Sequence, residues 1–321
     1  MYLIAFNDNE FKKAQLILGA RVAYMMGRKF EEDDWAHVYC KAKGIPAGTW
    51  SNLNADVEYN GLSLELKQIK RSESEALMND CGTELMHPSL TRKVGLRILT
   101  DPNESMRDVI RQYQLVLDKR IERIKEKFPL AKPDLRSGWL LYDSSLTEFL
   151  YFEESSENLN PDEHRAEWSE RASRGNSGRR TNKNLWIYNK KSGNKVWSVT
   201  GGGSGTKIQP YFRVPPKGSA GLYYFRVQGI PTLDGKIQIF VTAPTAQQLQ
   251  SILGEDYLKN INDAIINASG KIAEPRLVET DEPVVEIVVS TEAYTALIEK
   301  FPGVSDEHRV QLLCEQLSVK G

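Results

Sequence analysis

The sequence is poor in cysteine and histidine. Its three cysteines, Cys40, Cys81 and Cys314, lie far apart in the chain. This spacing excludes a dense disulfide framework and a CxxC metal site. The four histidines are also scattered, which argues against a zinc site. So few thiols are typical of a reducing compartment, and we expect a cytoplasmic protein.

Long apolar runs are missing as well. No stretch approaches the roughly 20 apolar residues that a membrane-spanning helix needs. The first residues, MYLIAFNDNEFKK, turn polar too early for a secretory signal. Hydrophobic residues make up 40% of the 321 residues and charged residues 26%, so the chain has enough apolar surface to bury a core.

Acidic residues are absent from one segment. Residues 171–217 contain 11 Lys and Arg but no Asp or Glu, although the net charge of the whole chain is only −1. The remaining residues therefore carry −12, and this separation predicts a polyanion-binding surface on an acidic body. The alternatives are a solvated pair of basic loops and a patch that docks an acidic protein.

The same segment is rich in Gly, Ser, Asn and Thr, which together with Arg and Lys supply the usual contacts to phosphates and base edges. We therefore predict that this part of the chain binds double-stranded DNA. The aromatic residues Trp186, Tyr188 and Trp197 are expected to pack within a sheet, because strands favour aromatic side chains. The candidate DNA contacts are Arg171, Arg174, Arg179, Arg180, Lys183, Lys190, Lys191, Lys195, Lys207 and Arg213.

Apolar periodicity predicts both helices and strands. Helical spacing covers residues 8–27, 31–43 and 105–128. Residues 62–69, LSLELKQI, alternate between apolar and polar and predict a strand with its leucines on one face. Other strands are expected at 94–99, 139–142, 149–152, 237–241 and 284–289 and, broken by turns, over 184–228. Residues 153–170 are expected to form an acidic loop, residues 247–267 one helix, and the last residues two short helices.

This mixture predicts an α/β or α+β fold with a mixed central sheet flanked by helices. We place a catalytic core at 1–152 and a basic, β-rich DNA-recognition region at 153–235. Residues 236–321 are expected to complete the fold or to form a dimer surface.

One short stretch combines two acids and a lysine. Asp56 lies before the turn sequence Asn60-Gly61, and Glu65 and Lys67 lie two residues apart in the strand that follows. Alternation along the strand places Glu65 and Lys67 on one face. Two close carboxylates favour a divalent cation, and Mg²⁺ prefers such oxygen ligands. The alternative is an ordinary amphipathic strand with its polar face in water.

The pattern Asp56…Glu65-Leu66-Lys67 resembles the signature of the PD-(D/E)XK nucleases, and the form GLSLELK is most similar to the MutH-like branch, which includes type II restriction endonucleases. The resemblance covers roughly residues 10–150, with Asn54-Ala55 where a proline often precedes the first acid. It implies a restriction-endonuclease-like core, Mg²⁺-dependent hydrolysis of DNA to leave 5′-phosphates, metal binding by Asp56 and Glu65, and a catalytic role for Lys67.

Other acids are candidates for the same centre. Several members of this family add a carboxylate from an upstream helix, which implies a role for Glu31 or Glu32, and Glu58 rivals Asp56 as the first ligand. The resulting hypothesis is a homodimeric type II restriction enzyme acting in restriction-modification. A MutH-like repair nickase, a non-cleaving DNA-binding protein of the same fold, and an RNA- or protein-binding module are the alternatives.

Overall fold

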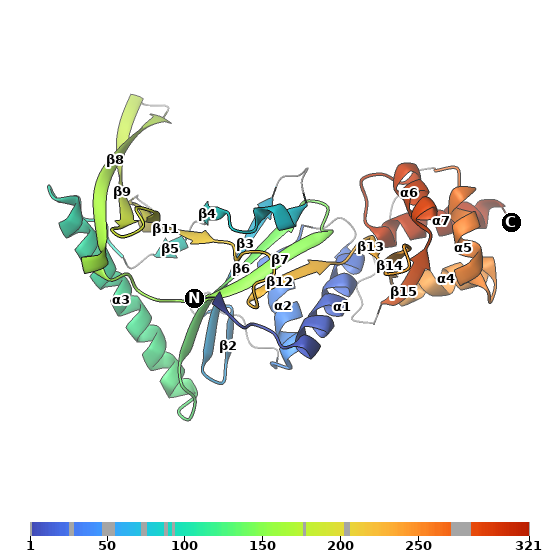
Figure 1. The fold of residues 1–321 in the computed structure, drawn as a ribbon, viewed down its shortest axis with the longest axis horizontal. Helices are drawn as coiled ribbons and strands as arrows, with labels where there is room; N and C mark the ends of the chain where they lie inside the picture. Colours follow the sequence, from blue (N-terminus) through green and yellow to red (C-terminus); the bar gives the residue numbers. More distant parts are fainter. Residues whose placement is uncertain are drawn as a thin grey trace.

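The computed structural model describes residues 2–25, 29–46, 55–71, 76–86, 89–91, 94–175, 178–201, 206–270 and 284–320. Within them the chain forms a mixed α/β fold with three sheets (Figure 1). The molecule is elongated, with a long two-stranded hairpin at one end and the C-terminal helices at the other. None of the described helices is long and apolar enough to cross a bilayer.

The first sheet is mixed and has the order β1–β7–β6–β3–β2, with β12 also paired to β7. Strands β3 and β6 run parallel, and helix α3 lies in the connection between them. A parallel pair needs such a crossover because the chain has to return to the same end of the sheet. The strands are β1 (Tyr2–Leu3), β2 (Val57–Tyr59), β3 (Leu62–Arg71), β6 (Asp134–Asp143), β7 (Glu148–Ser155) and β12 (Leu222–Arg226).

Helices α1 (Asp8–Met25) and α2 (Glu32–Lys43) cover one face of this sheet. Their apolar residues pack on Leu64 and Leu66 of β3 and on neighbouring residues of β6 and β7. Side chains alternate along a strand, so Glu65 and Lys67 project from the other face.

The second sheet has the order β4–β11–β10–β9–β8, with β5 also paired to β11. Helix α3 (Pro102–Lys127) covers one of its faces through Met106, Val109 and Ile110, which pack with Leu185 and Ile187 of β9. The strands are β4 (Glu84–Met86), β5 (Ser89–Thr91), β8 (His164–Gly175), β9 (Gly178–Asn189), β10 (Lys195–Thr200) and β11 (Thr206–Arg213), with the 3₁₀ turns η1 (Leu77–Asp80) and η2 (Pro161–Glu163) nearby in the chain.

The C-terminal part has a sheet of order β13–β14–β15 and its own apolar core. It packs on α1, where a Cβ at Gly19 would lie 2.7 Å from the Phe240 ring, so only glycine allows this close approach. Its elements are β13 (Ile230–Pro231), β14 (Ile237–Val241), α4 (Ala243–Leu253), α5 (Tyr257–Ile266), β15 (Val285–Val289), α6 (Thr291–Lys300) and α7 (Asp306–Lys320).

Most of the expected elements are confirmed, including the three N-terminal helices, the strand that begins at Leu62 and the two helices at the end of the chain. The strand expected at 94–99 is wrong. Both the amide and the carbonyl of Gly95 bond to the side chain of Gln112 on α3, at 2.7 and 3.0 Å, and Val94 joins the apolar cluster under that helix. The segment therefore follows the helix instead of a neighbouring strand.

Two further expectations are corrected. The region 153–170 is not an acidic loop, because β7 continues to Ser155 and β8 begins at His164. Within β8, Glu167 lies between Ala166 and Trp168, which both join the apolar cluster that contains the α3 residues. The single helix expected at 247–267 is two helices, because Gly254, with φ of 82°, ends α4.

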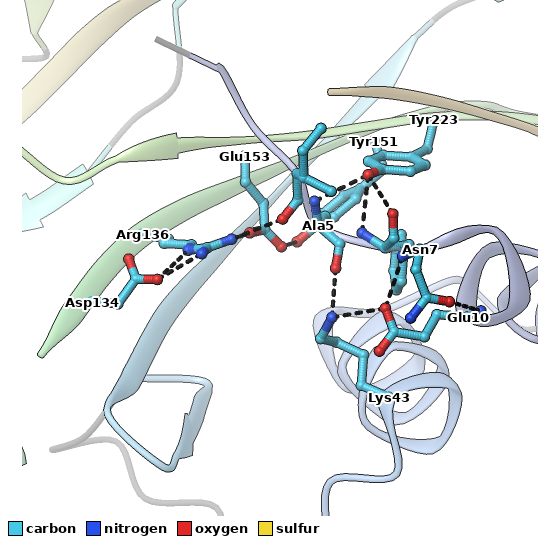
Figure 2. Close-up of polar contacts among 11 residues, drawn as sticks. Ala5, Asn7, Glu10, Lys43, Asp134, Arg136, Tyr151, Glu153 and Tyr223 are labelled. Carbon is cyan, nitrogen blue, oxygen red and sulfur yellow. Dashed lines mark hydrogen bonds and ion pairs between the residues drawn. The ribbon is translucent and has the colours of Figure 1, made fainter. Parts of the chain in front are cut away.

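A charged network lies under the first sheet, on the side of α1 and α2 (Figure 2). The side chain of Glu153 is fully buried and accepts from Arg136 at 2.9 Å and from the Tyr151 hydroxyl at 2.8 Å. Arg136 also donates to the Ile4 carbonyl at 3.1 Å. Next to it, the Tyr223 hydroxyl bonds the main chain of Phe6. The network ties the N-terminal segment to β6, β7 and β12.

We predict that Arg136→Met destabilises the protein by about 3 kcal/mol, because it leaves the buried Glu153 carboxylate without its cation. Urea unfolding measures the change. The matched control is Arg107→Met, which removes an arginine from an exposed ion pair with Asp162 and is expected to cost less than about 1 kcal/mol. Equal losses in the two variants would contradict the interpretation.

Candidate active site

The candidate site is built on the β2–β3 hairpin. Its turn is Asn60-Gly61, and both residues have positive φ, 44° and 90°. Such two-residue turns match the twist of the paired strands. A Cβ on Gly61 would lie 2.5 Å from the Lys132 carbonyl oxygen, so glycine is also required for space. The turn sets the register, with Val57 opposite Leu64.

The first acid lies where this ladder stops. Among the described residues, β2 pairs only with Leu62, Ser63 and Leu64, so β3 has a free edge beyond them. Asp56 directly precedes β2, and its Oδ2 accepts the Leu66 amide at 2.6 Å. The carboxylate thus replaces a strand as the partner of that amide, and this bond holds Asp56 beside the Glu65–Lys67 segment.

Glu65 and Lys67, two residues apart on the same face of β3, form an ion pair. The Lys67 ammonium lies 2.9 Å from Glu65 Oε1. Arg120, from the C-terminal half of α3, lies 3.3 Å from the other oxygen, Oε2. Helix α3 therefore contacts both the candidate site and the second sheet.

The charges of the site perturb one another. Burial, with Glu65 and Glu32 adding repulsion, raises the pKa of Asp56 to about 6, against the opposing effects of the Leu66 amide and Lys67. Burial also disfavours the charged form of Glu65, but Lys67 and Arg120 outweigh it and lower the pKa of that carboxyl. The pKa of Lys67 is raised, because Glu65, Glu32 and Asp56 together outweigh the effect of its burial.

The two additional acids of the upstream helix, Glu31 and Glu32, differ in their surroundings. Glu32, in the first turn of α2, is close enough to perturb both Asp56 and Lys67. The main chain of Glu31 is used at the helix start, where its amide donates to Asp34 Oδ2 at 2.8 Å and its carbonyl accepts from Gln68. Glu32 is therefore the helix acid that neighbours the sequence-predicted site.

Glu58 has partners of its own. Its side chain is only 4% exposed and is held by Arg123 and by Lys127, whose ammonium lies 3.4 Å from Oε2. Both cations come from α3. These pairs fix the C-terminal half of the helix on the hairpin and direct Glu58 toward the helix.

A divalent cation fits the donor set formed by Asp56 and Glu65. Mg²⁺ usually takes one or two carboxylates and completes its shell with water and phosphate oxygens. A cation would also offset the burial and the repulsion from Glu65 and Glu32 that raise the pKa of Asp56. Within the described residues, no group of three or more His, Cys, Asp or Glu side chains is arranged to hold a metal. Asp56 and Glu65 are thus two candidate ligands that have no third such side chain grouped with them in the described structure.

The predicted DNA contacts lie in strands of the second sheet or, for Lys190 and Lys191, in the turn between β9 and β10. Arg171, Arg174, Arg179 and Arg180 belong to the paired strands β8 and β9, with Arg174 opposite Arg179, and their side chains lie outside the described part of the structure. The remaining lysines have mixed surroundings. Lys183 is 3.6 Å from Glu170, and Lys190 donates to the Asp162 carbonyl. Among the members whose side chains are described, the exposed ones are Lys183, Lys190, Lys191, Lys207 and Arg213.

Lys195 lies in an aromatic cluster that the sequence did not predict. Its ammonium is 3.2 Å from the ring centre of Trp186, 5.8 Å from that of Tyr188 and 5.3 Å from that of Tyr211. The guanidinium of Arg165 stacks over Tyr188 at 4.6 Å. We name Arg165, Trp186, Tyr188, Lys195 and Tyr211 the aromatic–cation layer. Because Leu185 and Ile187 face α3, Trp186 and Tyr188 lie on the opposite face of the sheet.

The expectation that all three strand aromatics pack inside the sheet is therefore confirmed only for Trp197. That residue is buried and contacts Tyr113 of α3 edge-on. Trp186 and Tyr188 are half-buried and hold cations. Arg120 and Arg165 were missed by the sequence reasoning, because nothing in a helix or strand pattern identifies which surface arginine will meet a distant carboxylate or ring.

Comparison with protein-family models, with curated proteins and with solved structures returns no match.

We predict that Asp56→Asn stabilises the metal-free protein at pH 8. The folded-state pKa of about 6 lies above the unfolded value near 4, so the wild type loses stability as pH rises through 6, whereas asparagine does not titrate. The increase in the free energy of unfolding caused by Asp56→Asn should be about 1 kcal/mol larger at pH 8 than at pH 5. Urea unfolding at both pH values measures it, with the exposed Asp162→Asn as control. A pH-independent difference would show that burial does not destabilise this carboxylate.

Proposed function

We propose that the protein is a site-specific, Mg²⁺-dependent DNA endonuclease of the type II restriction kind, with a restriction-endonuclease-like core. The observation that carries this proposal is the convergence of Asp56, Glu65 and Lys67 at the free edge of β3. The same three residues carry the PD-(D/E)XK resemblance. The bond from the Leu66 amide holds the Asp56 carboxylate beside Glu65 and Lys67. This arrangement supports a functional site over an ordinary amphipathic strand with its polar face in water.

Each residue has a distinct role in this proposal. Asp56 and Glu65 would hold Mg²⁺, which when bound lowers the pKa of a water ligand and stabilises charge at phosphorus. The Lys67 ammonium, 2.9 Å from Glu65, would act as a cation that orients the attacking water or stabilises the phosphate oxygens. Glu32 is placed to add negative charge to the centre.

The second sheet would bind the DNA. Residues 171–217, which contain no acid, supply most of its cations, and the aromatic–cation layer lies on the face opposite α3. Aromatic rings beneath Lys195 and Arg165 restrict these long side chains, which lowers the entropy cost of a phosphate contact. A symmetric homodimer would allow both strands of a palindrome to be cut.

We expect Lys67→Ala and Glu65→Gln to lower the rate of Mg²⁺-dependent plasmid cleavage by at least about 100-fold, because the first removes a cation from the phosphate and the second removes a charged Mg²⁺ ligand. Purified protein is incubated with mixed-sequence, methylated and phage DNA, in Mg²⁺ or EDTA, and fragment ends are mapped. The matched control is Lys70→Ala, which lies on the same strand but is exposed.

The products distinguish the candidate functions. Discrete double-strand breaks lost in Lys67→Ala support the restriction enzyme, whereas single nicks would favour the nickase. DNA binding that ignores both Mg²⁺ and Lys67, with no cleavage of any substrate, would contradict the nuclease and favour a binding protein.

We predict that Lys195→Met weakens DNA binding and flattens its salt dependence. Loss of one phosphate contact should reduce the slope of log K against log salt by about 0.9. Fluorescence anisotropy at several salt concentrations measures the slope. Lys259→Met is the control, because this exposed lysine lies on α5 and pairs with Asp256. An unchanged slope for Lys195→Met would remove the aromatic–cation layer from the interface.

A further inference from the structure

Both oxygens of the Glu65 carboxylate are occupied by side-chain cations. Lys67 lies 2.9 Å from Oε1 and is only two residues away on the same strand. Arg120 lies 3.3 Å from Oε2 and comes from α3, 55 residues away in the chain. The two contacts therefore differ in origin, since one is fixed by the pleat of β3 and the other depends on where the helix sits.

We propose that Arg120 occupies the cation position of the site in the metal-free protein and that a divalent ion has to displace it from Glu65. The inference rests on the proposed function, because it assigns Asp56 and Glu65 as the metal ligands. Arg120 is a positioning residue in this scheme. It neutralises Glu65 until the metal arrives, and it sets how tightly the metal binds.

The geometry allows this exchange without unfolding. The side chain of Arg120 is 31% exposed, so its guanidinium is able to leave Glu65 for solvent. The same half of α3 is held on the hairpin independently, because Arg123 and Lys127 pair with Glu58. Releasing Arg120 therefore leaves the helix in place and opens only one carboxylate oxygen.

The exchange is also favoured electrostatically. An ion pair at a partly exposed position contributes little, whereas a divalent ion brings twice the charge of an arginine. The bond from Arg120 goes to Glu65 Oε2, so this arginine neutralises one carboxylate of the pair. A metal bound between Asp56 and Glu65 would serve both carboxylates.

The test is Mn²⁺ binding to the DNA-free full chain, measured by isothermal titration calorimetry near pH 7.5. Arg120→Gln should bind Mn²⁺ about fivefold more tightly than the wild type, because the competing cation is gone. Arg120→Lys keeps the charge and should lie between them. Lys127→Gln is the charge-matched control, since it removes one cation from the same helix face but pairs with Glu58, and it should resemble the wild type. Glu65→Gln should lose the binding.

The other outcomes overturn the proposal. Equal tightening by Lys127→Gln would show a general charge effect in place of direct occupancy. Unchanged or weaker Mn²⁺ binding by Arg120→Gln would show that Arg120 does not compete with the metal. If Glu65→Gln still loses Mn²⁺ binding in that case, the assignment of Glu65 as a metal ligand, and with it the proposed function, stands. If Arg120→Gln binds no Mn²⁺ at millimolar concentration, the inference fails by itself, because the nuclease proposal is judged separately by cleavage of DNA. Thermal unfolding of each variant excludes misfolding as the cause.

Discussion

The site depends on the shortness of β2. This strand pairs with only three residues of β3 within the described structure, so the Leu66 amide lies at a free edge and is taken up by the Asp56 carboxylate. A longer β2 would satisfy that amide with a backbone carbonyl and would leave Asp56 free to turn to solvent. One missing ladder contact thus brings an acid against two charged residues of the next strand, and burial then makes that arrangement electrostatically costly.

Helix α3 joins the two candidate functional surfaces of the molecule. Its first half packs on the second sheet, opposite the aromatic–cation layer, and its second half contacts the hairpin through Arg120, Arg123 and Lys127. The helix is also the crossover that makes β3 and β6 parallel. The connection that the sheet requires for topological reasons therefore also delivers positive charge to the acidic site.

Local patterns were sufficient for much of this structure. The alternation of LSLELKQI predicted β3 and placed Glu65 and Lys67 on one face, and Asn60-Gly61 predicted the hairpin turn. Patterns failed where a tertiary contact overrode them. Gly95 bonds to Gln112 of α3 and not to a strand, and Gly254 divides a segment whose apolar spacing continues through it.

The sequence by itself determined the segregation of charge, the main helices and strands, and the spacing of Asp56, Glu65 and Lys67, because these follow from residue order and from periods of 2 and 3.6. Only the tertiary structure decided that Glu32 neighbours the site while Glu58 turns to α3, that Arg120 holds Glu65, and that Lys195 lies among three rings. These pairings join segments far apart in the chain, and their energies depend on burial and distance, which no local pattern encodes.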